Sequence, residues 1–419
     1  MRTLTEHTAA INTRLARYGI RYGKIENHMY YEQRAPFDGQ PCVLPADVFA
    51  RLAQGVAQRV HALNLFLQDV YGAQHILRAG VIPSDFVHTS AGFLPQCAGL
   101  TKDGFLAAAA VDVVRGADGV WYALSDRTAA PAGMVYPLVT RELARMDCDL
   151  TGVADISRLG QWLAQSVARQ NAGGAAVVLT PGRSDPRWFE HHVLAERMGV
   201  PLVSADDLFV EDDVLFRRLE GGQSERVGAV LRRVPDALLD PRVLSPDSTC
   251  GVPGLLGACR AGNVRVLNAP GSGLAEDGGL YHFVPRIIEY YLHETQILPN
   301  IPTFLPYYES ERKYIIDHLS DLIVEDVEGG YGTVDGAGLN AEQLTSLRRT
   351  LISQSRRFVA RRKVTLASLT TEDGAAEQLG TRLFAVAGEQ GPCVWPGGLT
   401  RFARDGHEGF QDTWVMQNA

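Results

Sequence analysis

The sequence predicts an α/β protein, and three observations support this prediction. Residues 175–210 contain an apolar run (AAVVLT), a helical segment ending at Gly199 and a second apolar run (VPLVS), the order of a parallel βαβ unit. Residues 105–124 contain two apolar runs joined by a turn with Asp118-Gly119, the signal of a β-hairpin. Apolar residues make up 46% of the 419 residues, so the chain can form a large core.

The remaining elements follow from hydrophobic periodicity and turn signals. Leu52, Val56, Val60, Leu63 and Leu67 repeat at helical spacing and predict an amphipathic helix or helix pair over 51–78. The other predicted elements are strands within 215–233 and at 264–268, a helix over 279–294, a strand at 322–324, a helix near 340–356 and further strands after it.

Composition excludes several classes of protein. The 40 basic and 48 acidic residues give a net charge of −8, so nothing favours a nucleic-acid or membrane partner, and a small-molecule or peptide substrate is the better expectation. The six cysteines lack metal-ligand spacing and predict reduced thiols. The first twenty residues lack an apolar signal region, and no apolar run approaches the ~18 residues of a membrane span. A cytoplasmic location is therefore expected.

A glycine-rich loop is the first candidate for ligand binding. Gly329, Gly330 and Gly332 follow the apolar run 322–324, where their backbone N–H groups could approach a phosphate. The same residues could equally form a tight turn without a ligand. No GK[ST] follows, so this is not a Walker loop.

Acidic residues of the early hairpin are the second candidate. Asp112, Asp118 and Asp126 lie on or beside it, and carboxylates on adjacent strands can form a Mg²⁺ site. Asp118 is better explained as a solvated turn residue. Asp112 lies inside an apolar run, where its carboxylate needs a hydrogen-bonding or charged partner. Glu190 and the two histidines after it are adjacent on a helix, which favours ordinary helix surface or capping over catalysis. No nucleophile elbow, HExxH or GxGxxG is present.

Ordered blocks along nearly the whole chain carry a family resemblance. They include VDVVRGADGVWYALSD at 111–126, FEHHVLAERMGVPLVSADDL at 189–208, LDPRVLSPDSTCGVPGLLGACRAGNVRVLNAPGSG at 239–273, ILPNIPTF at 297–304 and DTWVM at 412–416. On these blocks the chain resembles the circularly permuted ATP-grasp proteins, the glutathionylspermidine-synthase-like amide ligases. The resemblance implies ATP and Mg²⁺ as cofactors and ATP-dependent carboxylate–amine ligation, C–N bond formation through an acyl phosphate.

The resemblance also implies an arrangement of the chain. Residues 1–160 would carry the metal-strand lobe, 161–300 an α/β pre-ATP-grasp-like domain with the βαβ unit, and 301–419 a small lobe with the glycine loop. The early hairpin and the strand at 322–332 would then border one nucleotide cleft. A substrate cleft would use residues that match the family, namely Arg232, Arg233, Asp240, Asp247, Ser248, Asn268 and Asp277.

The sequence departs from the family pattern at the positions where the family has its charged catalytic residues. Asp112 matches a metal ligand, but the Glu and Asn of the metal strand are replaced by Ser125 and Arg127, and Asp126 should point to the opposite face. The lysine before the glycine loop is replaced by Glu325, and Arg382 is one of few residues kept from a late charged motif. With four lysines in the chain, Lys313 is one of few substitutes.

Two main functional hypotheses remain open, beside a changed chemistry that would use the old substrate cleft. In the first, the nucleotide site is degraded, ATP and Mg²⁺ do not bind, and the chain is a binding or regulatory subunit beside an active ligase or operon-encoded partner. In the second, it is an active amide ligase with a rebuilt phosphate site using Arg127, Lys313 or Arg382. Because Arg127 adds a positive charge where the family has Asn, and Glu325 puts a negative charge where the family has Lys, we expect the two to form a direct or water-bridged salt bridge across the cleft.

Overall fold

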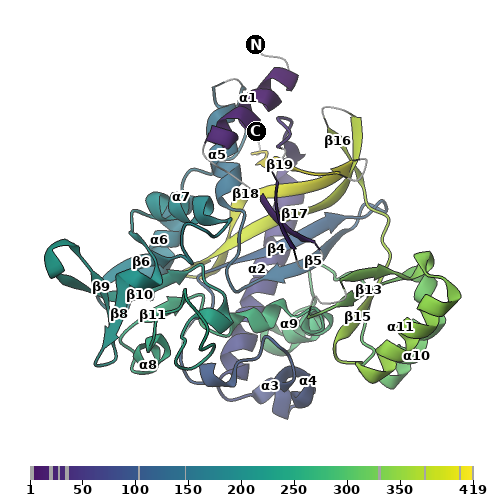
Figure 1. Ribbon diagram of the computed structural model, residues 1–419. Helices are drawn as coiled ribbons and strands as arrows, with labels where there is room; N and C mark the ends of the chain where they lie inside the picture. Colours follow the sequence, from purple (N-terminus) through teal and green to yellow (C-terminus); the bar gives the residue numbers. More distant parts are fainter. Residues whose placement is uncertain are drawn as a thin grey trace.

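The computed structural model describes residues 4–17, 22–26, 29–33, 37–101, 104–146, 148–328, 332–371, 374–404 and 407–417. Its β-strands form three main sheets, with helices packed around them. In Figure 1 the long strands β17 and β18 cross the middle of the molecule, with the teal α/β part on one side and the green α10 and α11 on the other.

The central sheet is built from both ends of the chain. Its strand order is β3 (Cys42–Leu44), β19 (His407–Val415), β18 (Gly391–Arg404), β17 (Gly374–Gly388), β4 (Ala108–Arg115) and β5 (Trp121–Arg127), and β16 (Ser368–Thr371) pairs with β17. The turn between β4 and β5 confirms the predicted hairpin. Antiparallel pairing of β4 with β17 sets Asp112 opposite Arg382.

Three buried threonines join neighbouring strands of this sheet. Thr381 and Thr400 Oγ1 atoms lie 2.8 Å apart, and those of Thr400 and Thr413 lie 2.9 Å apart. The Gln378 side-chain amide donates to Thr381 Oγ1 at 3.1 Å. The sheet therefore carries a row of hydroxyls across β17, β18 and β19.

The α/β part confirms the predicted βαβ unit. Parallel strands run in the order β7 (Leu202–Val203), β6 (Ala175–Leu179), β10 (Ser224–Arg232) and β11 (Arg265–Leu267), and β8 (Leu208–Glu211) and β9 (Val214–Arg218) extend β10 as an antiparallel meander. The covering helices are α6 (Leu159–Arg169), α7 (Trp188–Met198) and α8 (Leu255–Arg260). α7 ends at Gly199, whose φ of 70° is the left-handed cap that glycine adopts most easily.

The third sheet lies apart from the other two and has its own core. It has the order β12 (Thr303–Phe304), β15 (Phe358–Arg362), β13 (Leu322–Asp326) and β14 (Thr333–Asp335), and α10 (Glu309–Asp317) and α11 (Ala341–Ser353) accompany it. Ile315, Val324 and Leu351 lie in this core. α11 confirms the helix expected near 340–356 and begins with a capping box of Asn340 and Gln343.

The long helix α2 (Ala46–Val70) packs against the central sheet and confirms the predicted helix pair together with α3 (His75–Arg78). A Cβ atom at Gly55 would lie 2.8 Å from Leu298 Cβ, so glycine allows the 297–299 segment to lie against the helix. The remaining elements are α1 (Leu4–Arg17), the hairpin β1 (Tyr22–Glu26) and β2 (Met29–Gln33), α4 (Ser84–His88), α5 (Val135–Ala144) and α9 (Val284–Leu292).

The division of the chain at residues 160 and 300 stays a prediction. Residues 368–415 join the sheet of the early hairpin rather than the sheet of β13, so the late part of the chain contributes to two sheets. None of the helices in the described ranges is long and apolar enough to cross a membrane.

A buried ion pair fastens α2 to the edge of the central sheet. Arg59 Nε and Nη2 donate to Asp126 Oδ1 at 2.6 Å and Oδ2 at 2.8 Å, and both side chains are almost fully buried. Arg59 Nη1 donates to the Asn300 side chain at 2.6 Å. The Tyr281 ring lies under the guanidinium groups of Arg59 and Arg361, 5.1 and 4.5 Å from its centroid. This cluster joins four segments distant in sequence.

We expect Asp126→Asn to lower the free energy of unfolding by about 3 kcal/mol, because it leaves the Arg59 charge buried without its counterion. Chemical denaturation measures this loss. Asp118→Asn, at an exposed carboxylate in the turn of the same hairpin, is the matched control and should change stability by no more than about 0.5 kcal/mol. Equal losses in the two variants would show that the Arg59 pair adds little.

Candidate functional site

Asp112 is the centre of a charge cluster where β4, β5 and β17 meet. Arg382 Nε donates to Asp112 Oδ1 at 2.7 Å and Arg382 Nη2 to Asp112 Oδ2 at 2.8 Å. Ser125 Oγ donates to Asp112 Oδ2 at 2.8 Å, and Arg127 Nε lies 3.6 Å from the same oxygen. The partner expected for a carboxylate in an apolar run is therefore Arg382.

These contacts determine the ionisation of Asp112. Burial alone would raise its pKa, but the charge and hydrogen bonds of Arg382, together with Arg127 and Ser125, outweigh burial and hold the pKa below its usual value. Asp112 in turn raises the pKa of Arg382 against the opposing effect of burial. Asp112 is a carboxylate that the protein itself neutralises.

The two faces of β5 carry different charge clusters, as predicted from strand alternation. Ser125 and Arg127 contact Asp112 on one face, and Asp126 pairs with Arg59 on the other. Asp126 therefore cannot replace the missing ligand beside Asp112.

Glu276 lies at the C-terminal end of β5, next to the Asp112 cluster. The backbone N–H groups of Thr128 and Ala129 each donate to Glu276 Oε1 at 2.6 Å, and Arg127 Nη1 lies 3.9 Å from Glu276 Oε2. Arg127 stays 42% exposed, so it is the most accessible cation of this cluster. Glu276 ends the short 3-10 helix η5 (Ser272–Glu276), which holds it over the strand end.

The predicted pair between Arg127 and Glu325 is wrong as a direct salt bridge. Glu325 Oε2 lies 3.3 Å from Arg361 Nε, whereas the ion pairs of Arg127 are with Asp112 and Glu276. Cross-strand pairing of β13 with β15 brings Arg361 to the Glu325 side chain. A nearer cation therefore neutralises Glu325.

The expected approach of the early hairpin to the late strand is confirmed through Arg361. Its Nη1 donates to the Leu124 carbonyl of β5 at 2.8 Å, and its Nε pairs with Glu325 of β13. A cavity of about 190 Å³ is lined by Glu276, Asp277, Val327, Glu328 and Arg356, among others, but by no residue of the hairpin at 105–127. The hairpin and the late strand therefore meet through Arg361, and the expectation that they border one nucleotide cleft stays a prediction.

The glycine loop and Lys313 are the residues that were expected to contact phosphate. Gly329 and Gly330 lie outside the described residues, and Gly332 adopts a φ of 66° just after them. Lys313 is exposed on α10, and the ion pairs of Asp112 and Glu325 are made by arginines instead. The phosphate-binding role of these residues stays a prediction.

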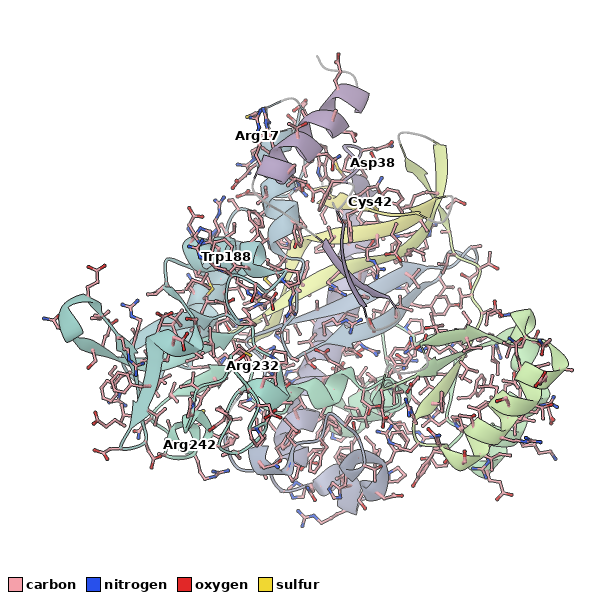
Figure 2. All side chains as sticks on the ribbon, in the orientation of Figure 1. Arg17, Asp38, Cys42, Trp188, Arg232 and Arg242 are labelled. Carbon is pink, nitrogen blue, oxygen red and sulfur yellow. The ribbon has the colours of Figure 1, made fainter. Side chains whose placement is uncertain are left out.

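Arg232 and Arg233 are both buried at the carboxyl end of β10, and Figure 2 places Arg232 near the middle of the molecule. Arg232 donates to the Asn268 carbonyl at 2.8 Å and the Ser272 hydroxyl at 2.9 Å and pairs with Asp236. Arg233 donates to the Pro131 carbonyl, and burial lowers its pKa. Arg232 therefore holds the loop at residue 236 and the loop at 268–272 together.

Glu190 and His191 differ from the helix-surface expectation, because both are fully buried. Glu190 Oε1 accepts the Gly133 N–H at 2.7 Å, and His191 Nδ1 lies 2.9 Å from Thr180 Oγ1. Burial, with added repulsion from Arg233, lowers the pKa of His191 to about 2, so this ring stays neutral. The third residue of the run, His192, is exposed and stacks on Trp188.

Most of the other predicted substrate residues form hydrogen bonds with backbone groups. Asp240 accepts the N–H groups of residues 242, 254 and 256, and Ser248 donates to the carbonyl of residue 238. Asn268 bonds the backbone of residues 107, 108 and 128. Asp247 is exposed, and Asp277 pairs with Arg356 beside the cavity. Of this set, Asp277 alone lines the cavity described above.

Two features of the site had no clear sequence signal. Glu276 contacts Thr128 and Ala129 across a sequence separation of about 150 residues, and local sequence patterns do not reveal contacts over such a distance. Arg361 joins β5 to β13 through one carbonyl and one carboxylate, and nothing in the local sequence distinguishes it from neighbouring arginines.

The pairing with Arg382 predicts a specific acid dependence of stability. Because the folded pKa of Asp112 is lowered, its contribution is present above its unfolded pKa of about 3.9 and is lost as pH falls through the folded value. Arg382→Gln should therefore reduce the loss of unfolding free energy between pH 6 and pH 3, measured by urea denaturation. Arg401→Gln removes a partly exposed pair with Glu408 and is the control. An unchanged pH dependence in Arg382→Gln would contradict this account.

Comparison with known proteins identifies relatives over almost the whole chain. An uncharacterized protein of Synechocystis sp. is 33% identical over 440 aligned residues, covering 99% of this chain and 91% of the relative. An uncharacterized protein of Mycobacterium tuberculosis is 36% identical, covering 92% of this chain and 74% of the relative. A Frankia alni protein that carries the name glutamate–cysteine ligase 2-3 is 34% identical, and the match covers 91% of this chain but 47% of the relative.

A solved structure and a family description agree with these relatives. The apo structure of a glutathione synthetase-like effector from Globodera pallida superposes with a TM-score of 0.60 at 10% identity, covering 99% of this chain and 98% of the other, which shows a shared fold. The family described as circularly permuted ATP-grasp type 2 matches residues 41–403. With both chain ends forming one sheet around Asp112 and Arg382, this match shows that the chain belongs to the circularly permuted ATP-grasp type 2 family.

Proposed function

We propose that this chain is an ATP-grasp family member whose nucleotide site is degraded and that it acts as a binding or regulatory subunit beside an active ligase. The supporting observation is the pair of residues that lie beside Asp112 where the family has oxygen ligands. Ser125 Oγ donates to Asp112 Oδ2 at 2.8 Å, and Arg127 Nε lies 3.6 Å from the same oxygen. A hydroxyl and a guanidinium therefore stand where a metal would need a carboxylate and an amide oxygen.

The residues present do not fit a magnesium ion. Mg²⁺ prefers near-octahedral oxygen coordination with one or two carboxylates and substrate phosphates. At this position Asp112 is engaged by Arg382, Ser125 stands in place of the family's glutamate, and the Arg127 guanidinium stands in place of an oxygen ligand. Throughout the described ranges, no group of three or more His, Cys, Asp and Glu residues could hold a metal.

The cost to catalysis is large. Loss of one preorganised charge-stabilising donor costs about 3 kcal/mol of transition-state stabilisation, and two metal ligands and the loop lysine are replaced here. Even with strong non-additivity, a slowdown of about 10⁴ or more follows. We infer that the cleft no longer supports phosphoryl transfer at a useful rate.

The partner is inferred from the relatives. Less than half of the Frankia alni chain named glutamate–cysteine ligase lies within the match, so this chain spans about half of that protein. We infer that the family can work joined to or beside a second catalytic unit. The name glutamate–cysteine ligase fits a partner of this chain that is an amide ligase acting on a small-molecule or peptide substrate.

The alternative is an active amide ligase with a rebuilt phosphate site. Arg127 favours it, because its guanidinium is 42% exposed and lies 3.6 Å or more from its carboxylate partners. Arg382 is committed to Asp112, and Lys313 lies on the outer helix α10. Phosphate binding by Arg127 alone would be weaker than binding by a metal with a lysine.

We expect no saturable ATP binding and no Mg²⁺-dependent ADP release by the purified protein. Calorimetric titration with ATP, with and without Mg²⁺, measures the first, and a coupled ADP assay measures the second. The physical reason is the replacement of oxygen ligands and lysine by Ser125, Arg127 and Glu325. Robust ADP release by the unmodified protein would support the rebuilt ligase instead.

Restoring the family's side chains should restore nucleotide binding. The triple variant Ser125→Glu, Arg127→Asn, Glu325→Lys recreates two oxygen ligands and the lysine, so ATP with Mg²⁺ should give a saturable calorimetric signal. The matched control is Asp118→Asn on the same hairpin, which should bind no better than wild type. A folded triple variant without ATP binding would show that these three positions do not account for the loss.

A further inference from the structure

We propose that the end of β5 is an oxyanion-binding site that Glu276 fills from within the chain, and that a small carboxylate or phosphate ligand would take the place of the Glu276 side chain. This goes beyond the proposed function, because it holds whether or not the protein has lost ATP chemistry. It concerns one carboxylate and three donor groups.

The donors converge on a single carboxylate. The N–H groups of Thr128 and Ala129 both point at Glu276 Oε1, each at 2.6 Å, and the Arg127 guanidinium approaches Glu276 Oε2 at 3.9 Å. Successive backbone N–H groups that converge on one point form an anion-binding concavity. A neighbouring guanidinium adds the positive charge that a carboxylate or phosphate requires.

Glu276 separates the donors from a cavity. It lines the cavity of about 190 Å³ together with residues 327–328, whereas Arg127, Thr128 and Ala129 do not line it. The Glu276 and Arg127 side chains are 25% and 42% exposed. Displacing the Glu276 side chain would therefore open this cavity toward the donors that it now contacts.

Arg127 remains incompletely paired when Glu276 is in place. Asp112 is already engaged by Arg382 and Ser125, and its closest oxygen is 3.6 Å from Arg127. The contact with Glu276 is longer still, at 3.9 Å. A free oxyanion, not tethered to η5, could approach this guanidinium within the ~2.7–2.9 Å of a charge-assisted hydrogen bond. A free oxyanion could therefore come closer to Arg127 than the Glu276 carboxylate does.

In the competing explanation, Glu276 serves only to hold η5 against β5. Thr128 Oγ1 also donates to the Ser272 carbonyl at 2.7 Å, so η5 stays attached to β5 without Glu276. If Glu276 serves only as a tether, its replacement lowers stability but creates no anion affinity. The two explanations therefore predict different binding data.

The test compares Glu276→Ala, Glu276→Gln and wild type by titration with sodium acetate and, separately, sodium phosphate at chloride-matched ionic strength. Binding is followed by the amide NMR signals of Thr128 and Ala129 and by thermal unfolding. We expect Glu276→Ala to bind at least about tenfold more tightly than wild type, with Glu276→Gln between them. A difference between the affinities for acetate and phosphate would show which oxyanion the site prefers.

Two controls make the result specific. Asp118→Ala removes one negative charge from the same hairpin away from the site and should bind like wild type. Adding Arg127→Ala to Glu276→Ala should abolish the gain. Folded Glu276→Ala that binds no more tightly than wild type overturns the proposal, and if that variant does not fold, the same result for Glu276→Gln overturns it.

Discussion

The pairing of Asp112 with Arg382 is the constraint on which the candidate site depends. The two residues lie 270 positions apart, opposite each other on paired strands, so the ion pair can form only when the early and late parts of the chain share one sheet. Arg382 donates to both oxygens of Asp112, so this carboxylate has a counterion that is fixed within the fold.

The cluster around Arg59 and Tyr281 adds a second constraint. It connects α2, β5 and the segment at 300 through hydrogen bonds, and Arg361 extends it to β13. Removing one member of a buried ion pair leaves an uncompensated charge, which is costly. Arg361 therefore ties the sheet of β13 to the central sheet.

The sequence could predict the elements and the alternation of β5, because both depend on local periodicity. It placed Asp126 on the face away from Asp112 and required a partner for Asp112. It could not identify partners set by strand register. The expectation for Glu325 was wrong because β15 supplies Arg361, and the sequence does not reveal that β13 pairs with β15. The burial of Glu190 and His191 was missed because it depends on packing against the 131–133 turn.

The row of threonines in the central sheet has a consequence for strand register. Thr400 Oγ1 lies within hydrogen-bond distance of both Thr381 Oγ1 and Thr413 Oγ1, and the Gln378 side-chain N–H donates to Thr381 Oγ1. A shift of β18 by two residues would keep the same faces but break both hydroxyl contacts at once. The middle hydroxyl therefore penalises a slip of β18 against either neighbour, and a valine at position 400 would keep the volume while removing both contacts.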